Sequence, residues 1–278
     1  MGNIETLSNG SRSVSILGSN GFIGSAIVQN LIVGGWKVDQ ISKLNIDNFL
    51  IDDEIETVVN CVGTFTKDVK LAYEVNSRFP AELAKQTATS GSRLVHFGSS
   101  AEYAPSEHLI TETNATKTTS VYSESKLLGS NAVIENGLNE KSIVLRPFGV
   151  VQDVANPLPP NASNLMSVIS DASTNDVVKV KNPKAIRDLV NVNEVANATI
   201  KLLDRSMPWP KILNISSGTG HSVEEILSLV NPNIQIIHEE ISYGDKYVGD
   251  TNLLSTFLDF DFDKVLNVVL FGKFCDNA

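Results

Sequence analysis

A tyrosine and a lysine lie four residues apart in the segment VYSESKLLGSNAVIE (121–135), whose pattern predicts a helix. Tyr122 and Lys126 therefore share one face of that helix and can reach a common ligand. A free phenol has a pKa of about 10, too high for efficient proton transfer near neutral pH. A nearby ammonium group stabilises the phenolate and lowers that pKa. The pair indicates acid/base chemistry, although the same spacing also occurs by chance on exposed helix faces.

A glycine-rich turn directly follows the apolar run SVSIL (13–17) and opens a second predicted helix, over 22–33. Glycines at such a turn let backbone N–H groups approach a pyrophosphate, which the positive end of the helix dipole also attracts. The spacing is Gly-x-x-Gly-x-x-Gly rather than the more common Gly-x-Gly-x-x-Gly, and a purely structural turn is the alternative. We expect a dinucleotide to be bound by Gly18, Ser19, Asn20, Gly21, Phe22, Ile23 and Gly24.

The end of the second predicted strand, WKVDQIS (36–42), determines which nicotinamide cofactor fits. If this strand ends at Ile41, Ser42 and Lys43 lie at its tip, where a hydroxyl and an ammonium group suit the 2′-phosphate of NADP(H). If the strand ends earlier, Asp39 becomes the acid that binds the ribose hydroxyls of NAD(H). The sequence favours NADP(H) and leaves NAD(H) as the alternative.

Short apolar runs alternate with amphipathic stretches over the first 150 residues. This alternation is typical of βαβ units and predicts the α/β class, with a Rossmann-type doubly wound parallel sheet. Pro80 should kink the helix predicted over 72–90 or mark a boundary in it. The remaining strands of this sheet are predicted over 57–63, 93–99 and 142–148.

The regular alternation of strands and helices ends in the second half of the chain, where a Pro- and Asn-rich loop follows Phe148. We expect an NAD(P)-binding Rossmann domain over 12–150, to which later segments return. Residues 151–278 are expected to form mainly a smaller C-terminal α/β domain that binds substrate.

The composition excludes several classes of protein. A hydrophobic content of 42% supports a sizeable core, but no apolar stretch approaches the ~20 residues that span a bilayer, and the polar N-terminus does not resemble a signal peptide. The net charge of −10 argues against nucleic-acid binding. Two cysteines and four scattered histidines predict neither a disulfide framework nor a metal site. We expect a cytoplasmic protein with no membrane or nucleic-acid partner.

Six motifs, in this order and at suitable spacing, resemble those of the extended short-chain dehydrogenases/reductases of the NAD-dependent epimerase/dehydratase type. The resemblance covers about residues 13–258. It implies a Rossmann domain that binds NAD(P), a C-terminal domain for nucleotide sugars and a Ser/Thr–Tyr–Lys catalytic set. Members of the family often form homodimers, so a homodimer is one expectation. The motifs are GSNGFIG (18–24), NCVG (60–63), GSSAEY (98–103), YSESK (122–126), RPFGV (146–150) and AIRDLVNVNEVANA (185–198).

The resemblance also implies roles for single residues. Tyr122 is the expected proton donor or acceptor, and Lys126 is expected to bind the nicotinamide ribose and to lower the tyrosine pKa. Ser100 is the expected ligand of the reacting oxygen, with Ser99 as the alternative because GSSAEY is one residue shorter than the usual spacing. Further cofactor contacts are implied for Cys61, Val62, Gly63, Asn76, Ser99, Pro147 and Phe148.

Arg187, in RDLVNV, is implied as a ligand of the nucleotide-sugar diphosphate. It follows the basic stretch KVKNPKAIR (179–187) in a strongly acidic protein, and a diphosphate requires such a local group of cations. The loop from Asn156 to Asn164 is expected to close over the nucleotide. Alternatively, these cations form a solvated face and Arg187 a surface ion pair.

Three reactions compete: carbonyl reduction, 4-epimerisation and 4,6-dehydration. The short chain and the Ser42–Lys43 tip favour reduction. The segment LVHFGSSAEY and the short region from Cys61 to Asn76 are most similar to nucleotide-linked 4-keto-6-deoxysugar reductases of deoxysugar biosynthesis. The resemblance thus implies NADPH-dependent reduction of a nucleotide-diphosphate-linked 4-keto(-6-deoxy)sugar. Glu102 occupies the acid position of the dehydratases and is a candidate substrate contact, but a surface glutamate is the favoured interpretation because Ala101 precedes it. A non-catalytic NADP-sensing protein is a further alternative, which the Tyr–Lys pair disfavours.

Overall fold

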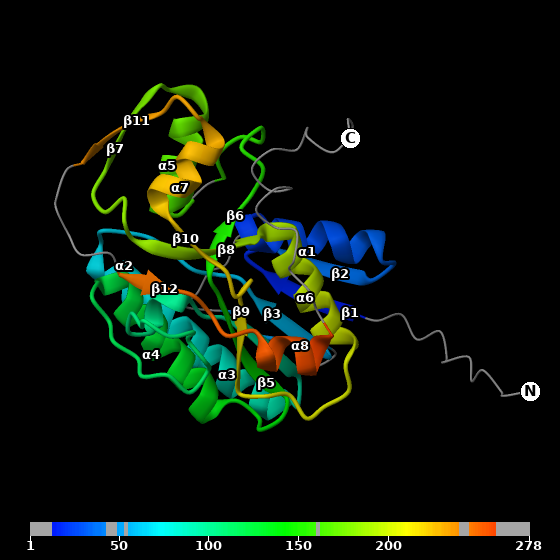
Figure 1. Ribbon diagram of the computed structural model, residues 1–278. Helices are drawn as coiled ribbons and strands as arrows, with labels where there is room; N and C mark the ends of the chain where they lie inside the picture. Colours follow the sequence, from blue (N-terminus) through cyan, green and yellow to red (C-terminus); the bar gives the residue numbers. More distant parts are fainter. Residues whose placement is uncertain (1–12, 43–48, 53–54, 160–161, 239–244, 260–278) are drawn as a thin grey trace, which may run out of the picture.

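The computed structural model describes residues 13–42, 49–52, 55–159, 162–238 and 245–259. Its centre is a six-stranded sheet in the order β2-β1-β3-β4-β5-β9, in which every neighbouring pair is parallel (Figure 1). The predicted Rossmann-type parallel sheet is therefore confirmed. Its strands are β1 (Ser13–Leu17), β2 (Lys37–Ile41), β3 (Thr57–Asn60), β4 (Arg93–Phe97), β5 (Ser142–Pro147) and β9 (Ile212–Ile215).

Helices cover both faces of this sheet, which explains why its inner strands are apolar without a polar face. Successive strand residues point to opposite faces, so Val95 packs in one hydrophobic cluster and its neighbour Leu94 in the other. The first cluster includes α1 (Phe22–Val33) and α6 (Val192–Asp204), and the second includes α3 (Phe79–Ser90) and α4 (Val121–Asn136).

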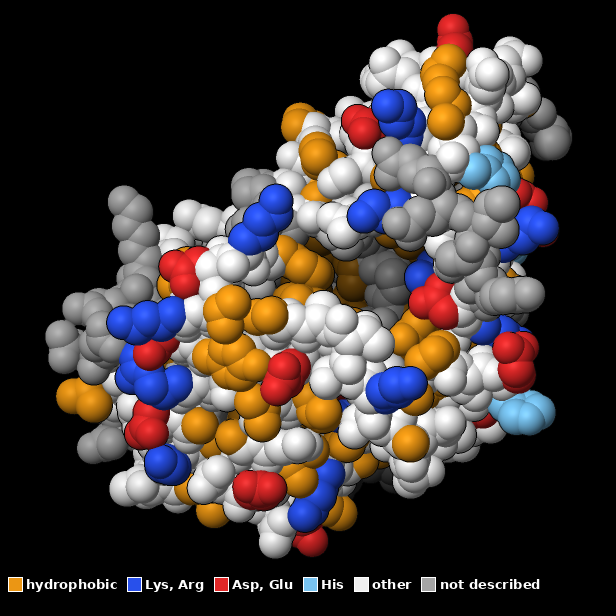
Figure 2. All heavy atoms as spheres, turned by 90° about the vertical axis from the view of Figure 1, so that its left-hand side faces the viewer, with side chains coloured by type: hydrophobic (Ala, Val, Ile, Leu, Met, Phe, Trp, Pro, Cys, Tyr) orange, Lys and Arg blue, Asp and Glu red, His pale blue; other side chains and the backbone are white. Residues whose placement is uncertain are grey.

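A second, smaller part of the molecule lies above the carboxyl ends of these strands (Figure 1). Seen from the side of α4, the surface is hollowed between this upper part and the sheet (Figure 2). We call it the upper part; its strands form a four-stranded sheet, in which β8 pairs with β6, β10 and β12, and a parallel pair of β7 and β11. It consists of β6 (Gly149–Val151), α5 (Asn164–Thr174), β7 (Val177–Val180), β8 (Ile186–Asn191), β10 (Gly220–Ser222), α7 (Val223–Val230), β11 (Gln235–His238) and β12 (Lys246–Tyr247). After it, α8 (Asn252–Leu258) packs against β9.

The helix predicted over 72–90 begins earlier and has three consecutive segments: α2 (Val69–Tyr73), the π-helical η1 (Glu74–Arg78) and α3. The boundary expected near Pro80 is present, because Pro80 lies in the first turn of α3. Proline has no N–H group to donate to the Asn76 carbonyl four residues earlier, and the π-helical turn lies at that point. A Cβ atom on Gly129 of α4 would lie 2.0 Å from the Asn76 carbonyl oxygen. Only glycine therefore lets α4 approach η1 so closely.

Within the described ranges, no helix is both long and apolar enough to cross a bilayer.

Candidate active site

The glycine-rich turn is closed tightly enough to require its glycines. Gly18 has φ +76°, a left-handed conformation that favours glycine. A Cβ atom on Gly24 would lie 2.2 Å from the Gly18 carbonyl oxygen. The Gly18 N–H donates to the carbonyl of Ile41 at 2.8 Å, which fixes the turn against the end of β2. The turn therefore presents the N-terminus of α1 at the edge where β1 and β2 end.

This turn fits the pyrophosphate of a dinucleotide. Ser19 is buried, yet its hydroxyl has no hydrogen-bond partner among the described residues. Gly21, the N-cap residue directly before α1, supplies no side chain to cap the free N–H groups of the first turn. A buried hydroxyl and free N–H donors at one helix N-terminus are what an anionic group requires. The residues from Gly18 to Gly24 would hold it.

The second strand ends at the residue on which the choice between the two nicotinamide cofactors was based. β2 ends at Ile41, which places Ser42, exposed, at its tip. Asp39 lies inside the strand, and its carboxylate accepts a hydrogen bond from the Ser15 hydroxyl at 3.0 Å. Lys43 lies outside the described residues. Asp39 is thus not at the strand tip, the position expected of the acid in an NAD(H) site.

Tyr122 lies in the first turn of α4, next to the end of β4. Burial raises the pKa of Tyr122 to about 12, a hydrogen bond with the Ser99 side chain acts against this, and the nearby charge of Glu102 adds to it. The ring of Phe65 stacks on the Tyr122 ring, with centroids 3.7 Å apart and planes inclined by 17°. The phenol is therefore fully protonated at neutral pH.

Lys126 is buried beneath Tyr122, one helical turn further along α4. Its ammonium group donates to the carbonyl of Phe97, the last residue of β4. Burial lowers the pKa of Lys126 to about 8, although the nearby carboxylate of Glu102 opposes this. The expected lowering of the tyrosine pKa is not found. The pKa of Tyr122 is raised instead, because desolvation of the phenolate is the largest effect on it.

Of the two candidate serines, Ser99 is the one whose side chain forms a hydrogen bond with Tyr122. The Ser99 hydroxyl caps a short 3-10 turn, η2 (Ser100–Glu102), where it accepts from the Ala101 N–H at 3.2 Å. Ser100 is the first residue of that turn. The tight turn after β4 thus compensates for the shorter spacing in GSSAEY. As a result, Ser99 lies next to the phenol of Tyr122.

Glu102 is fully buried, so its expected position on the surface is wrong. Its carboxylate accepts from the Ser99 N–H at 2.8 Å and from the Ser130 hydroxyl at 2.9 Å. It also pairs with the guanidinium of Arg146, with 2.8 Å between Nε and Oε2. Arg146 is itself 2% exposed and stacks on the ring of Tyr103. This ion pair joins β5, α4 and η2 directly behind the serine and tyrosine.

Sequence reasoning did not identify Arg146 as part of the site. The signal was present, since an arginine inside the apolar strand SIVLRPF must have an anionic partner if the strand is buried on both faces.

The loop after β3 passes close to Lys126. A Cβ atom on Gly63 would lie 3.8 Å from the Lys126 ammonium nitrogen and 3.6 Å from the Asn76 amide oxygen. Burial raises the pKa of the Cys61 thiol to about 12, so this cysteine is not a thiolate nucleophile. The Val62 N–H donates to the Asn60 side chain at 3.0 Å. The expected cofactor residues 61–63 and Asn76 thus lie beside the lysine, and Gly63 leaves room there for a ligand.

Two further residues of this region serve the core. His96 is fully buried beside the Asn60 amide, and burial lowers its pKa well below the usual value, so this histidine is a packed core residue. The Phe148 ring is buried against Tyr103 and Ile110, while Pro147 ends β5.

Arg187 lies in β8, in the upper part, and already has an anionic partner. Its guanidinium binds both carboxylate oxygens of Asp245, at 2.9 and 3.1 Å, and the Asp245 backbone carbonyl at 3.0 Å. It also lies 5.2 Å from the centre of the Tyr247 ring. A diphosphate would have to replace Asp245. The lysines of the preceding basic stretch, Lys179, Lys181 and Lys184, are exposed.

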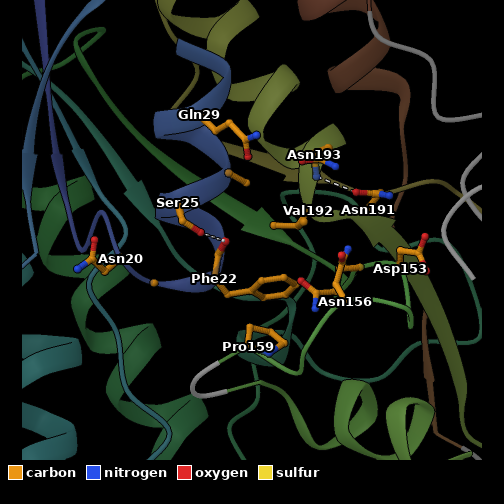
Figure 3. A pocket seen from close by; sticks show the side chains of 13 residues that line it. Asn20, Phe22, Ser25, Gln29, Asp153, Asn156, Pro159, Asn191, Val192 and Asn193 are labelled. Atoms are coloured by element: carbon orange, nitrogen blue, oxygen red, sulfur yellow. Dashed lines mark hydrogen bonds between the residues drawn. The ribbon is translucent and has the colours of Figure 1, made fainter. Parts of the chain in front are cut away.

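A cleft of about 360 Å³ lies beside the glycine-rich turn (Figure 3). It is lined by α1 residues from Phe22 to Gln29, by the loop after β6 from Gln152 to Pro159, and by the start of α6. The described part of the loop that was expected to close over a nucleotide therefore faces α1. Tyr122 and Lys126 are not among the lining residues. The described residues also contain no group of three or more His, Cys, Asp or Glu side chains that could hold a metal ion.

Residues 14–216 match the NAD dependent epimerase/dehydratase family. The chain belongs to this family. The sequence-based assignment to extended short-chain dehydrogenases/reductases is confirmed.

Curated relatives of this family member include methionine adenosyltransferase 2 subunit beta of Rattus norvegicus and of Mus musculus. Each is 25% identical over 237 residues, which are 76% of this chain. The chain spans 66% of the length of these relatives.

Solved structures with the same fold include a 4-ketosugar reductase, a 4-epimerase and a 5,6-dehydratase. A dTDP-4-dehydrorhamnose reductase from Clostridium acetobutylicum has a TM-score of 0.74 and 18% identity, covering 90% of this chain and 93% of that one. A UDP-glucose 4-epimerase from Thermotoga maritima, with UDP-glucose, has a TM-score of 0.76 and 17% identity, covering 92% and 97%. An NAD dependent NDP-hexosamine 5,6-dehydratase of tunicamycin biosynthesis has a TM-score of 0.76 and 16% identity, covering 93% and 96%. At these low identities, the comparison shows only that this epimerase/dehydratase family member shares the fold of these enzymes. Its reaction has to be inferred from the site.

Proposed function

We propose that the protein reduces a nucleotide-diphosphate-linked 4-keto(-6-deoxy)sugar to the hydroxy sugar, with NADPH as the reductant. The observation that carries this proposal is the burial of Glu102 and its ion pair with Arg146. A 4,6-dehydratase needs a free acid at that position, but Glu102 is fully buried and paired with Arg146. The remaining acid/base machinery, Tyr122 with Ser99 and Lys126, is what a carbonyl reduction requires.

Bound NADPH would supply a hydride to the ketone carbon. Tyr122 donates its phenolic proton to the oxygen of that ketone as it becomes an alkoxide. The Ser99 hydroxyl donates a hydrogen bond to the same oxygen and stabilises its developing charge. We therefore assign to Ser99 the role expected of Ser100. Lys126 would bind the nicotinamide ribose, and its positive charge favours the tyrosinate that remains after proton transfer.

The preference for NADP(H) is part of this proposal. It is supported by the end of β2 at Ile41 and by the exposed Ser42 at the tip, with Lys43 next in the sequence. Fluorescence titration with NADPH and NADH should show tighter binding of NADPH. Lys43→Asp should reverse the preference, and tighter binding of NADH by the natural sequence would contradict it.

The nucleotide-sugar substrate is supported by Arg187, whose planar guanidinium already holds a bidentate carboxylate. Calorimetric titration of UDP, CDP and dTDP into the NADP-saturated protein should show binding of one of them, weakened by Arg187→Ala. Absence of binding at millimolar concentration would leave a reductase of unphosphorylated ketones.

The decisive experiment measures NADPH oxidation with a small panel of nucleotide-linked 4-ketosugars. Turnover is expected with at least one of them. Tyr122→Phe keeps the ring but removes the proton, so turnover should fall by about 10²–10⁴-fold with NADPH affinity unchanged. Isomerisation of a nucleotide sugar without net NADPH oxidation would instead identify a 4-epimerase.

A second candidate function is that of a nicotinamide-binding subunit of another enzyme. It is favoured by the curated relatives, which are named as subunit beta of a methionine adenosyltransferase. In that case no ketosugar is reduced, and NADPH changes the association with a partner as measured by analytical ultracentrifugation. The homodimer, the cytoplasmic location and the division into domains over 12–150 and 151–278 remain predictions.

A further inference from the structure

An aromatic side chain beside the tyrosine has no role in the function proposed so far. Phe65 lies in the loop between β3 and α2, and its ring stacks on Tyr122 with a centroid distance of 3.7 Å. It nevertheless remains 51% exposed. One part of this ring therefore covers the Tyr122 ring, and the other part is open to contact by a ligand.

The position of Phe65 is fixed by a buried clamp on the residue before it. The side chain of Asn76 accepts from the Thr64 N–H at 2.9 Å and donates to the Thr64 carbonyl at 3.0 Å. The same amide donates to the Ser125 hydroxyl of α4 at 3.0 Å, and Ser125 donates in turn to the Tyr122 carbonyl at 3.0 Å. Asn76 is fully buried. The loop and the helix that carries the tyrosine are thus held together, and the stacked ring is part of the wall of the site.

This wall favours an apolar substrate surface. A hydroxyl packed against the Phe65 ring would lose its water without gaining a hydrogen-bond partner, whereas a methyl group would gain apolar contact. The carbon atoms on either side of a reacting C4 carbonyl are C3, which bears a hydroxyl, and C5, which bears C6. C6 is apolar only where it is a methyl group, as in a 6-deoxysugar.

We propose that Phe65 is the specificity-determining residue of this site, and that its exposed ring packs against the C6 methyl group of a 4-keto-6-deoxysugar. This inference rests on the proposed function and narrows its substrate class. The matching 4-ketosugar with a 6-hydroxyl group is discriminated against at this contact.

The test compares kcat/KM for two nucleotide-linked 4-ketosugars that differ only in a methyl or a hydroxymethyl group at C5. The natural sequence should prefer the methyl sugar by about 10–100-fold, the range for a contact of this size. Phe65→Ala should abolish that preference, mainly through KM, with NADPH affinity unchanged. Phe65→Leu, which keeps an apolar side chain, should retain most of it. Ile32→Ala is the matched control, because Ile32 is similarly exposed (53%) at the far end of α1.

Each result distinguishes this inference from the proposed function. Turnover of both sugars with equal kcat/KM, unaffected by Phe65→Ala, would overturn the role of Phe65 and leave the reductase intact. Absence of turnover on either sugar would overturn both.

The cover over Tyr122 has a test of its own that needs no substrate. Tetranitromethane nitrates accessible tyrosines, and peptide mapping would give the rate at Tyr122. This rate should rise several-fold in Phe65→Ala and stay unchanged in Ile32→Ala. An unchanged rate in Phe65→Ala would show that the ring does not cover the phenol, and would overturn the proposed wall.

Discussion

Replacing Glu102 by Gln tests both the buried ion pair and the choice between reductase and dehydratase. Glutamine keeps an acceptor oxygen for the Ser99 N–H and the Ser130 hydroxyl, both of which bind the same carboxylate oxygen. It replaces the oxygen that accepts from Arg146 by an amide nitrogen, so that Arg146 remains buried without a counter-ion or an acceptor there. The expected result is a less stable protein whose folded molecules still have an ordered site.

The size of the loss follows from the geometry. Two unit charges 2.8 Å apart attract each other by about 6 kcal/mol at an effective dielectric constant of about 20. Desolvation of both groups offsets part of this, and breaking one side of a buried pair typically costs about 3–5 kcal/mol. For a chain of 278 residues, that loss lowers Tm by about 5–9 °C.

The assay is a double-mutant cycle with Glu102→Gln, Arg146→Met and both together, measured by urea unfolding. Each single variant leaves one buried group unmatched, whereas the double variant removes both charges. The double variant should therefore lose clearly less stability than the sum of the two single losses. Additive losses would show that the two groups are not coupled and refute the argument from the ion pair.

Activity in the same variant separates the reactions. Per folded molecule, a reductase should keep far more of its turnover in Glu102→Gln than the 10²–10⁴-fold loss expected when a catalytic acid is removed. A loss of that size, with folding retained, would contradict the reductase proposal and favour a dehydratase.

Three further predictions follow from single distances and pKa values. Ser99→Ala should lower kcat by about 10²–10³-fold through loss of a donor to the alkoxide, and an equal loss in Ser100→Ala would contradict the assignment of Ser99. Gly24→Ala places a Cβ atom 2.2 Å from the Gly18 carbonyl oxygen and should lower NADPH affinity at least tenfold in a fluorescence titration, whereas Gly34→Ala, with 3.4 Å to its nearest neighbour, should not. Burial raises the pKa of Asp188 from 3.8 to about 6, so the folded state holds this proton to higher pH than the unfolded state, and the free energy of unfolding should fall by about 2 kcal/mol between pH 4 and pH 7. Urea unfolding of the natural sequence and of Asp188→Asn at each pH would check this. The difference in the free energy of unfolding between the two proteins should change with pH, and a difference independent of pH would refute the prediction.

Much of the fold could be predicted because its signals are local. Apolar runs bounded by turns gave the central strands, and the lack of an N–H group on Pro80 predicted the boundary near η1. The end of β2 at Ile41 agrees with the strand predicted from the segment WKVDQIS. The order of the strands in the sheet depends on pairing between distant segments, which local patterns do not encode.

The parts of the site that could not be predicted depend on contacts between distant residues. Glu102 was assigned to the surface because its partner Arg146 lies 44 residues away and becomes a neighbour only when β5 pairs with β4. The Asp245 partner of Arg187 is 58 residues away for the same reason. The choice between Ser99 and Ser100 depended on a single 3-10 turn. The stacking of Phe65 on Tyr122 had no sequence signal, because the clamp that fixes it involves Asn76 from another element.

The position of β9 beside β5 has a consequence for how the chain is made. These strands are neighbours in the sheet, yet the whole stretch between Pro147 and Ile212 separates them in the sequence. A ribosome releases the chain from its N-terminus, so β5 keeps an unpaired hydrogen-bonding edge until β9 has emerged. Unpaired strand edges recruit other chains. A nascent chain that stalls before Ile212 is therefore an aggregation-prone intermediate, and the six-stranded sheet cannot be completed before β6, α5, β7 and β8 of the upper part have been translated.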